Sequence, residues 1–144
     1  SADNPYLPAN RVEDAVIYSG THDNDTVVGW YRGLDPAARD YVHRVLGCGP
    51  DDVPDALLRS VWASRAEVAI FPLQDLLGLG PEARMNTPST VTGNWTWRFN
   101  WAAMPAGLAA DCRRQAREAG REPPGRTVSR DRVAAVQPAP ASRA

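Results

Sequence analysis

The stretch Ala15-Val16-Ile17-Tyr18-Ser19-Gly20-Thr21-His22-Asp23-Asn24-Asp25-Thr26 joins a short apolar run to a polar loop. The apolar run shows no alternation with polar residues, which predicts a strand buried on both faces in a parallel sheet. Polar and turn-forming residues seldom follow such a strand unless their loop caps a helix or holds a ligand, and the two roles can coexist. We expect Asn24 or Asp25 to cap a short helix that begins near Thr26. Since a cap needs only one acceptor, the neighbouring His22 and Asp23 remain candidates for a site.

A second apolar run, Val68-Ala69-Ile70-Phe71, stops at Pro72. Two helical patterns lie between the runs: Asp35-Pro36 opens a helix that Gly47 closes, and a second amphipathic helix is expected over about residues 54–67. Apolar residues recur on one side of the first of these helices, so we expect that side to be buried. The order strand, helices, strand predicts a βαβ unit with two adjacent parallel strands. The fold class is therefore α/β.

The rest of the chain is loop, one helix and a tail. Loops 19–25 and 72–97 should meet at one edge of the sheet, because parallel strands gather their site loops at their carboxyl ends. The segment 78–92 has no hydrophobic period, and such a long loop is usually functional or disordered. A last helix is predicted over residues 105–119. We expect residues 1–119 to form the folded part and residues 120–144, which contain four Pro, five Arg and no aromatic residue, to be disordered.

Composition excludes several chemistries and partners. All 16 basic residues of the 144 are Arg, so lysine-based Schiff-base or general-base chemistry within this chain is excluded. Cys48 and Cys112 are too few for a disulfide framework and have no partner at metal-ligand spacing, which favours a cytoplasmic location and no metal site. We expect no secretory leader, and the sequence contains no apolar run long enough to span a membrane, so we expect no membrane partner. The basic tail has no aromatic residues among its arginines for base stacking, so we expect no nucleic-acid partner.

His22 and Asp23 have the chemistry of a sugar-binding site. A carboxylate can accept two hydroxyl hydrogen bonds and an imidazole can donate one, so the pair suits the vicinal hydroxyls of a sugar. The alternative is a contact between the two side chains that only orders the loop.

Three further positions are candidates. Asn86 lies in the aperiodic loop, where its amide either reaches a bound hydroxyl or forms an Asx turn ahead of a proline. Asp75 follows the second strand and is either a helix cap or a site residue. Trp95 and Trp97 alternate, which would place both rings on one side of an extended segment, and core packing is favoured there over sugar stacking.

Four blocks of the sequence resemble the C-terminal end of the 4-α-glucanotransferases, also called amylomaltases or disproportionating enzymes. The blocks are Thr21-His22-Asp23-Asn24-Asp25-Thr26 with Gly29-Trp30-Tyr31, Phe71-Pro72-Leu73-Gln74-Asp75-Leu76-Leu77-Gly78, Ala83-Arg84-Met85-Asn86-Thr87-Pro88, and Gly93-Asn94-Trp95-Thr96-Trp97-Arg98. The resemblance covers roughly residues 3–119. It implies the C-terminal part of a (β/α)8 TIM barrel, about its last two βα units. It also implies an enzyme that transfers a segment of an α-1,4-glucan to the 4-hydroxyl of an acceptor sugar, with retention and without a cofactor.

The resemblance also implies roles for residues. His22 and Asp23 would hydrogen-bond the donor glucose, and Asp23 would be the third essential acid, which stabilises an oxocarbenium-like transition state. Thr21 and Asn86 would contact the substrate. The implied partners are maltooligosaccharides or α-1,4-glucan and the remainder of the barrel.

Two departures from the family concern loop shape and catalysis. Ser19 stands where the family has Thr, and Ser89 stands where it has a Gly that could supply a positive φ. Retaining transfer needs a carboxylate nucleophile and a carboxylic acid/base roughly 5 to 5.5 Å apart, and the family carries both on strands four and five. We therefore expect this chain to be the C-terminal piece of a longer enzyme and to be inactive alone. The alternative is a stand-alone carbohydrate-binding or regulatory module without catalysis.

Overall fold

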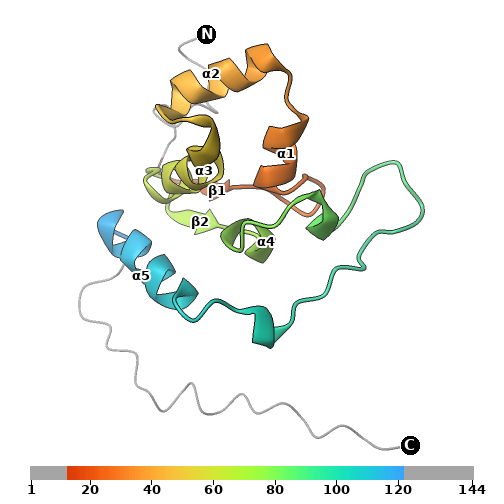
Figure 1. Ribbon diagram of the computed structural model, residues 1–144. Coiled ribbons are helices and arrows are strands. Elements are labelled where there is room, and N and C mark those ends of the chain that lie inside the picture. The colour runs from red at the N-terminus through yellow and green to blue at the C-terminus, as the bar shows by residue number, and fades with distance from the viewer. Residues whose placement is uncertain (1–12, 122–144) are drawn as a thin grey trace, which may run out of the picture.

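Two short parallel strands form the centre of the structure. The computed structural model describes residues 13–121 (Figure 1). Strand β1 (Val16–Tyr18) pairs in parallel with strand β2 (Val68–Ile70), and Val16 lies opposite Val68. The predicted α/β unit with two adjacent parallel strands is therefore confirmed.

Helix α1 (Val27–Gly33) begins directly after the polar loop, as expected, but its cap is Thr26. The Thr26 hydroxyl accepts a hydrogen bond from a backbone N–H in the first turn, at 3.0 Å. Asn24 Oδ1 instead accepts from the backbone N and the hydroxyl of Thr21, both at 2.8 Å, and Asp25 Oδ1 accepts from the backbone N of the next residue. The prediction that Asn24 or Asp25 caps the helix is wrong, because these side chains fold the loop upon itself.

Helix α2 (Pro36–Leu46) has the ends that the sequence predicts. Asp35 Oδ1 accepts from Ala38 N at 2.8 Å, and Gly47 ends the helix with φ of 63°, a conformation that Gly adopts without a steric penalty. The predicted burial of its apolar side is wrong within residues 13–121, since Tyr41 is 53% exposed and none of the helix is buried. The apolar side of α2 lines an open groove, whose other walls come from α1 and from helix α3 (Val53–Trp62). These two helices cover the apolar side of α2 only in part.

Helix α3 (Val53–Trp62) supports the sheet. Its Val61 is 2% exposed and packs against Ile17 of β1 and Ala66 in a buried hydrophobic cluster. The helix ends at Trp62, earlier than the predicted residue 67, because the chain turns there to enter β2.

The turn after α3 is held by Arg121. Its guanidinium donates to the carbonyl oxygens of Trp62 and Ser64, each at 2.7 Å, and of Ala66, at 2.8 Å. These carbonyls lie at the end of α3 and in the connection to β2. The early end of the helix therefore depends on a residue more than fifty positions away in the sequence.

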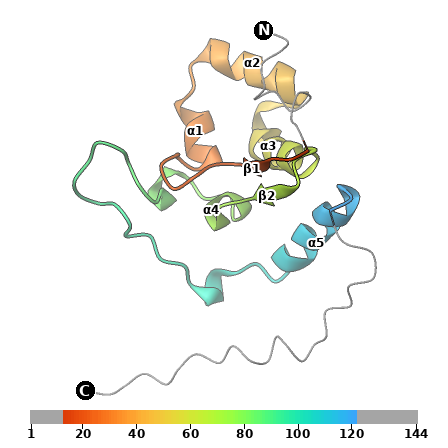
Figure 2. The same cartoon turned by 180° about the vertical axis from the view of Figure 1, so that it is seen from behind.

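The strands are covered on one face only within residues 13–121. Ile17 is buried against α3, whereas Val16 and Tyr18 are 51% and 47% exposed, and Val68 and Ile70 are 43% and 42% exposed. The prediction that both faces are buried is therefore wrong for this part of the chain. Figures 1 and 2 show helices α1, α2 and α3 gathered on the same side of the strand pair.

The chain beyond β2 is mostly loop. The remaining elements are α4 (Leu73–Leu76), α5 (Leu108–Glu118) and 3-10 turns at Pro50–Asp52, Pro81–Ala83 and Trp101–Ala103. The predicted loop 78–92 contains one of these turns, and the predicted last helix is present with shorter ends. The prediction of a disordered tail is wrong for Gly120 and Arg121, because Arg121 is bound to the end of α3. From residue 122 onward the prediction falls outside the described residues. No described helix is both long enough and apolar enough to cross a membrane.

Candidate active site

The loops that follow the two strands meet, as predicted, at one edge of the sheet. The backbone N of Asn86 donates to the carbonyl oxygen of His22 at 3.1 Å, and Asn86 Nδ2 donates to Asp23 Oδ1 at 2.7 Å. The side-chain amide of Asn86 therefore binds the opposite loop and does not form the Asx turn that was the alternative. His22, Asp23 and Asn86 come together at the surface.

Asp23 is fixed through one of its carboxylate oxygens. Oδ1 accepts from Asn86 and also lies 3.3 Å from His22 Nε2. Oδ2 makes no hydrogen bond to any residue between 13 and 121. The side chains of His22 and Asp23 are 57% and 51% exposed. One carboxylate oxygen thus orients the side chain, while the other has no partner within residues 13–121 and can accept a hydrogen bond from a ligand.

Arg84 was given no role from the sequence, although it lies within one of the quoted blocks. Its guanidinium donates to the carbonyl oxygen of Asp23 at 2.8 Å and to that of Asn86 at 2.9 Å, and Nη1 lies 4.0 Å from Asp25 Oδ2. A single rigid guanidinium therefore bridges both loops. Its position two residues before Asn86 could have indicated that Arg84 lies at the site.

Trp95 lies over His22 and not in the core. The two ring centroids are 5.3 Å apart with the planes tilted by 34°, and Trp95 is 54% exposed. Its φ of 61° removes it from an extended backbone, so the predicted alternation with Trp97 and the favoured core packing are wrong for Trp95. A hydrogen bond from its backbone N to Met85 O, 2.8 Å long, holds it there.

The turn before Trp95 is shaped by Asn94, which the sequence interpretation did not identify as important. Asn94 Oδ1 accepts from Thr87 N at 2.9 Å, and its Nδ2 donates to Thr90 O at 3.1 Å. Ser89, where the resemblance implies Gly, has φ of 67° and so adopts the left-handed conformation. A residue with a Cβ pays about 1 to 2 kcal/mol for this conformation. The hydrogen bonds of Asn94 help the turn to keep its shape despite the missing Gly.

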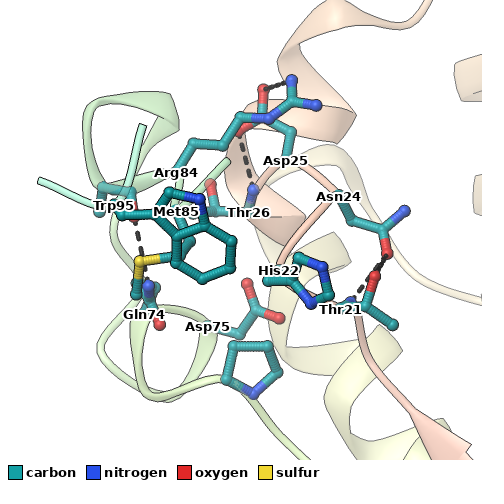
Figure 3. A pocket seen from close by; sticks show the side chains of 12 residues that line it. Thr21, His22, Asn24, Asp25, Thr26, Gln74, Asp75, Arg84, Met85 and Trp95 are labelled. Atoms are coloured by element: carbon teal, nitrogen blue, oxygen red, sulfur yellow. Dashed lines mark hydrogen bonds and ion pairs between the residues drawn. The ribbon is translucent and has the colours of Figure 1, made fainter. Parts of the chain in front are cut away.

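A pocket of about 200 Å³ opens between these loops (Figure 3). Its wall includes Thr21, His22, Asp75 and Trp95 among the predicted site residues, whereas Asp23 and Asn86 are not part of the wall. Figure 3 shows Trp95, Met85 and Gln74 on one side of the hollow and His22, Asn24 and Thr21 on the other. The pocket therefore has an aromatic wall and a polar wall.

Asp75 is buried, with 6% of its surface exposed. Its Oδ1 accepts from Val27 N and its Oδ2 from Ser19 Oγ, each at 2.8 Å. Both oxygens are thus bound to other parts of the chain. Asp75 lies within α4 and does not cap that helix, so the cap interpretation is wrong for α4. Its side chain instead accepts a hydrogen bond from the first residue of α1, beside the Thr26 cap.

No cluster of His, Cys, Asp or Glu in the described part of the chain could hold a metal ion. Cys48 and Cys112 are free thiols. Partial burial raises the pKa of the Cys112 thiol, and the neighbouring Asp111 carboxylate adds to this effect. Neither cysteine lines the pocket. The chemistry of the site is therefore that of imidazole, carboxylate, amide and indole groups.

A parallel α/β unit with these groups at the carboxyl ends of its strands places the chain among α/β proteins with loop-built sites. The family described as 4-alpha-glucanotransferase matches residues 1–104. The 4-alpha-glucanotransferase of Streptococcus pneumoniae is 50% identical over 102 residues, which are 69% of this chain and 19% of that protein. The chloroplastic/amyloplastic 4-alpha-glucanotransferase of Arabidopsis thaliana is 49% identical over 99 residues, 68% of this chain and 17% of its own length.

A solved structure agrees with the sequence matches. The amylomaltase of Streptococcus agalactiae, solved in complex with acarbose, aligns with a TM-score of 0.78 and 29% identity, over 84% of this chain and 25% of that one. The chain belongs to the 4-alpha-glucanotransferase family. It spans about a fifth of the length of the relatives that it matches in sequence.

Proposed function

We propose that this chain forms the donor-sugar side of the active site in a 4-α-glucanotransferase. That enzyme moves a segment of an α-1,4-glucan to the 4-hydroxyl of an acceptor sugar and retains the anomeric configuration. The hydrogen bond from Asn86 to Asp23 carries the proposal, because it joins the two site loops at an exposed edge beside a pocket. The acarbose complex of the Streptococcus agalactiae amylomaltase supports α-glucan oligosaccharides as the ligands.

His22 and Asp23 would bind hydroxyls of the donor glucose. Asp23 Oδ1 is held by Asn86 and His22, so Oδ2 presents a fixed acceptor to the sugar. As the glycosidic bond breaks, positive charge grows on the sugar ring and its hydroxyls become more acidic. A carboxylate that accepts from them gains more in the transition state than in the ground state, which is what catalysis requires.

Trp95 would provide an apolar platform for a sugar ring. Its exposed indole lies on the wall of the pocket next to the His22 imidazole. A sugar packs one apolar face on an aromatic ring while its edge hydroxyls meet polar groups. The arrangement of Trp95 opposite Thr21 and Asn24 supports this orientation (Figure 3).

The two strands would be about the last two of a (β/α)8 barrel, and the barrel's other segments would supply the nucleophile and the acid/base. In a retaining enzyme the two carboxyl groups lie roughly 5 to 5.5 Å apart, on either side of the bond that breaks. We propose no residue of this chain for either role. The chain would act with the remainder of the barrel, in the cytoplasm and without a cofactor. The two free cysteines support a reducing compartment such as the cytoplasm. The alternative is a plastid, because the Arabidopsis thaliana relative is described as chloroplastic/amyloplastic.

A graft tests the proposal. The matching segment of the Streptococcus pneumoniae 4-alpha-glucanotransferase is replaced by the corresponding residues of this chain, and disproportionation of maltotriose is measured. We expect activity in the graft, a large loss on Asp23→Asn, and no loss on Asp40→Asn, a matched change on the exposed surface of α2. Equal activity of the two Asn variants would refute the proposed site.

A further inference from the structure

The loop that carries His22 and Asp23 is held at both of its ends by one carboxylate. Strand β1 ends at Tyr18 and helix α1 begins at Val27. Ser19 Oγ donates to Asp75 Oδ2, and Val27 N donates to Asp75 Oδ1, each at 2.8 Å. Asp75 therefore fixes the distance between the start and the end of the loop.

Asp75 is suited to this task because it is buried and has two side-chain oxygens, one for each end of the loop. The resemblance implies Thr at residue 19, and Ser and Thr both provide the hydroxyl that Asp75 binds. The departure at residue 19 thus preserves the contact.

The residue before Asp75 holds the other site loop. Gln74 is 8% exposed, and its Nε2 donates to Ala83 O at 3.3 Å. Ala83 directly precedes Arg84, whose guanidinium bridges Asp23 and Asn86. Adjacent side chains of α4 therefore fix both loops that meet at the site.

We propose that Asp75 is a positioning residue, whose carboxylate clamps the two ends of the loop 19–26 and so sets where His22 and Asp23 stand relative to the donor sugar. The inference rests on the proposed function of that loop. It replaces the substrate-binding role considered for Asp75 from the sequence. Gln74 assists by fixing the segment that carries Arg84.

Ser19 variants in the graft provide the first test, because they remove one end of the clamp and leave Asp75 in place. Ser19→Ala should lower kcat for maltotriose roughly 10- to 100-fold, the range expected when a catalytic group is misplaced by about 1 Å, with KM nearly unchanged. Ser19→Thr restores the hydroxyl and should keep kcat close to that of the graft. Ser60→Ala is the matched control, since Ser60 Oγ donates to Leu57 O on α3 at 2.7 Å, away from the site. A kcat for Ser19→Ala equal to that of Ser60→Ala would overturn the inference.

A double-variant cycle separates positioning from loss of stability. Once Asp23→Asn has removed the larger transition-state contact, displacing its loop can affect only His22, so Ser19→Ala should lower kcat by clearly less than it does in the unmodified graft. Two effects that simply multiply would overturn the inference, because independent damage is multiplicative. If Asp23→Asn alone leaves kcat unchanged, the proposed function fails. If it lowers kcat while Ser19→Ala does not, only the clamp fails.

Asp75→Asn distinguishes the clamp from a sugar contact. Its amide oxygen can still accept from Val27 N, and its NH2 group can donate to Ser19 Oγ, so both ends of the loop stay bound. The variant should therefore retain most of the activity of the graft. A loss as large as that of Asp23→Asn would show that the charge of Asp75 acts on the substrate, and the positioning role would be wrong.

Discussion

The carboxyl edge of the strand pair and its uncovered face are built in opposite ways. At the edge, the two loops bond to one another through Asn86, Arg84 and Asp75. On the face, apolar side chains such as Val16 and Tyr18 remain about half exposed. The site thus takes its local shape from contacts within this chain, whereas the scaffold presents apolar surface that those contacts do not cover.

This difference separates two requirements of an enzyme. Hydrogen bonds between neighbouring loops are directional and can fix a site from few residues. A two-stranded sheet is stable only when other elements pack on it and bury its apolar side chains, and burying both faces requires a layer on each side. A short chain can therefore encode the geometry of a sugar site without providing a complete scaffold for it.

The largest effect is expected when the 144-residue chain is assayed alone. We expect no transfer of glucosyl units from maltotriose, because the nucleophile and acid/base of the proposed mechanism come from other segments. We also expect binding of an apolar dye, since the open face and the groove beside α2 expose apolar side chains. Glucose release by the purified chain, abolished by Asp23→Ala, would contradict the first expectation. The graft serves as the positive control in the same assay.

The sequence predicted the polar edge better than the apolar face, for a physical reason. Asp35 and Gly47 end α2 through local rules of helix capping, and Asp23 and Asn86 meet because parallel strands gather their following loops. These features depend on short-range chemistry and on topology. What covers an apolar face depends on other segments, so the continuous apolar run 15–18 could not show that Tyr18 stays exposed.

Three details of the site depended on contacts that sequence spacing does not reveal. Thr26 caps α1 because Asn24 and Asp25 are used within the loop. Trp95 leaves an extended conformation because Asn94 ties the preceding turn. Each outcome followed from competition among several polar side chains for the same backbone groups, which a single pattern cannot resolve.

Within the site, Asp23 should show the largest effect. Asp23→Asn in the graft keeps the shape of the side chain but removes the charge. Asp23 accepts from two sugar hydroxyls in the proposed mechanism, and charge-assisted hydrogen bonds contribute about 1.5 to 3 kcal/mol each. The barrier should therefore rise by roughly 3 to 5 kcal/mol, and kcat should fall about 10²- to 10⁴-fold. Steady-state kinetics with maltotriose measure this. If kcat stays within a few-fold of the graft while KM rises, Asp23 binds substrate without a transition-state role.

His22 should matter less, because it donates to a single hydroxyl. His22→Asn in the graft should lower kcat roughly 10- to 10²-fold, which is about 1.4 to 2.7 kcal/mol of barrier. His43→Asn is a matched control, since His43 contacts the Tyr31 hydroxyl at 2.9 Å on the helical side of the molecule. An effect of His22→Asn as large as that of Asp23→Asn would mean that the imidazole, and not the carboxylate, carries the transition-state contact.

The smallest effect is expected from Trp95, and it should appear in binding and not in chemistry. Trp95→Ala in the graft removes the platform proposed for a sugar ring and the ring contact with His22, whose centroids are 5.3 Å apart. Aromatic contacts contribute about 0.5 to 1.5 kcal/mol beyond their buried area, so KM for maltotriose should rise roughly 2- to 12-fold. Trp95→Phe should recover most of this, because it restores an aromatic face on the same backbone.

Trp101→Ala serves as the control for Trp95, since that indole is 79% exposed and does not line the pocket. If the Trp95 indole is a platform for a sugar ring, Trp95→Ala should raise KM and Trp101→Ala should not. The rise in KM should also change with the length of the maltooligosaccharide. A fall in kcat without a rise in KM would instead mean that the indole acts by orienting His22. In that case the aromatic wall belongs to the network of contacts that fixes the polar edge, and the sugar would be held by hydrogen bonds alone.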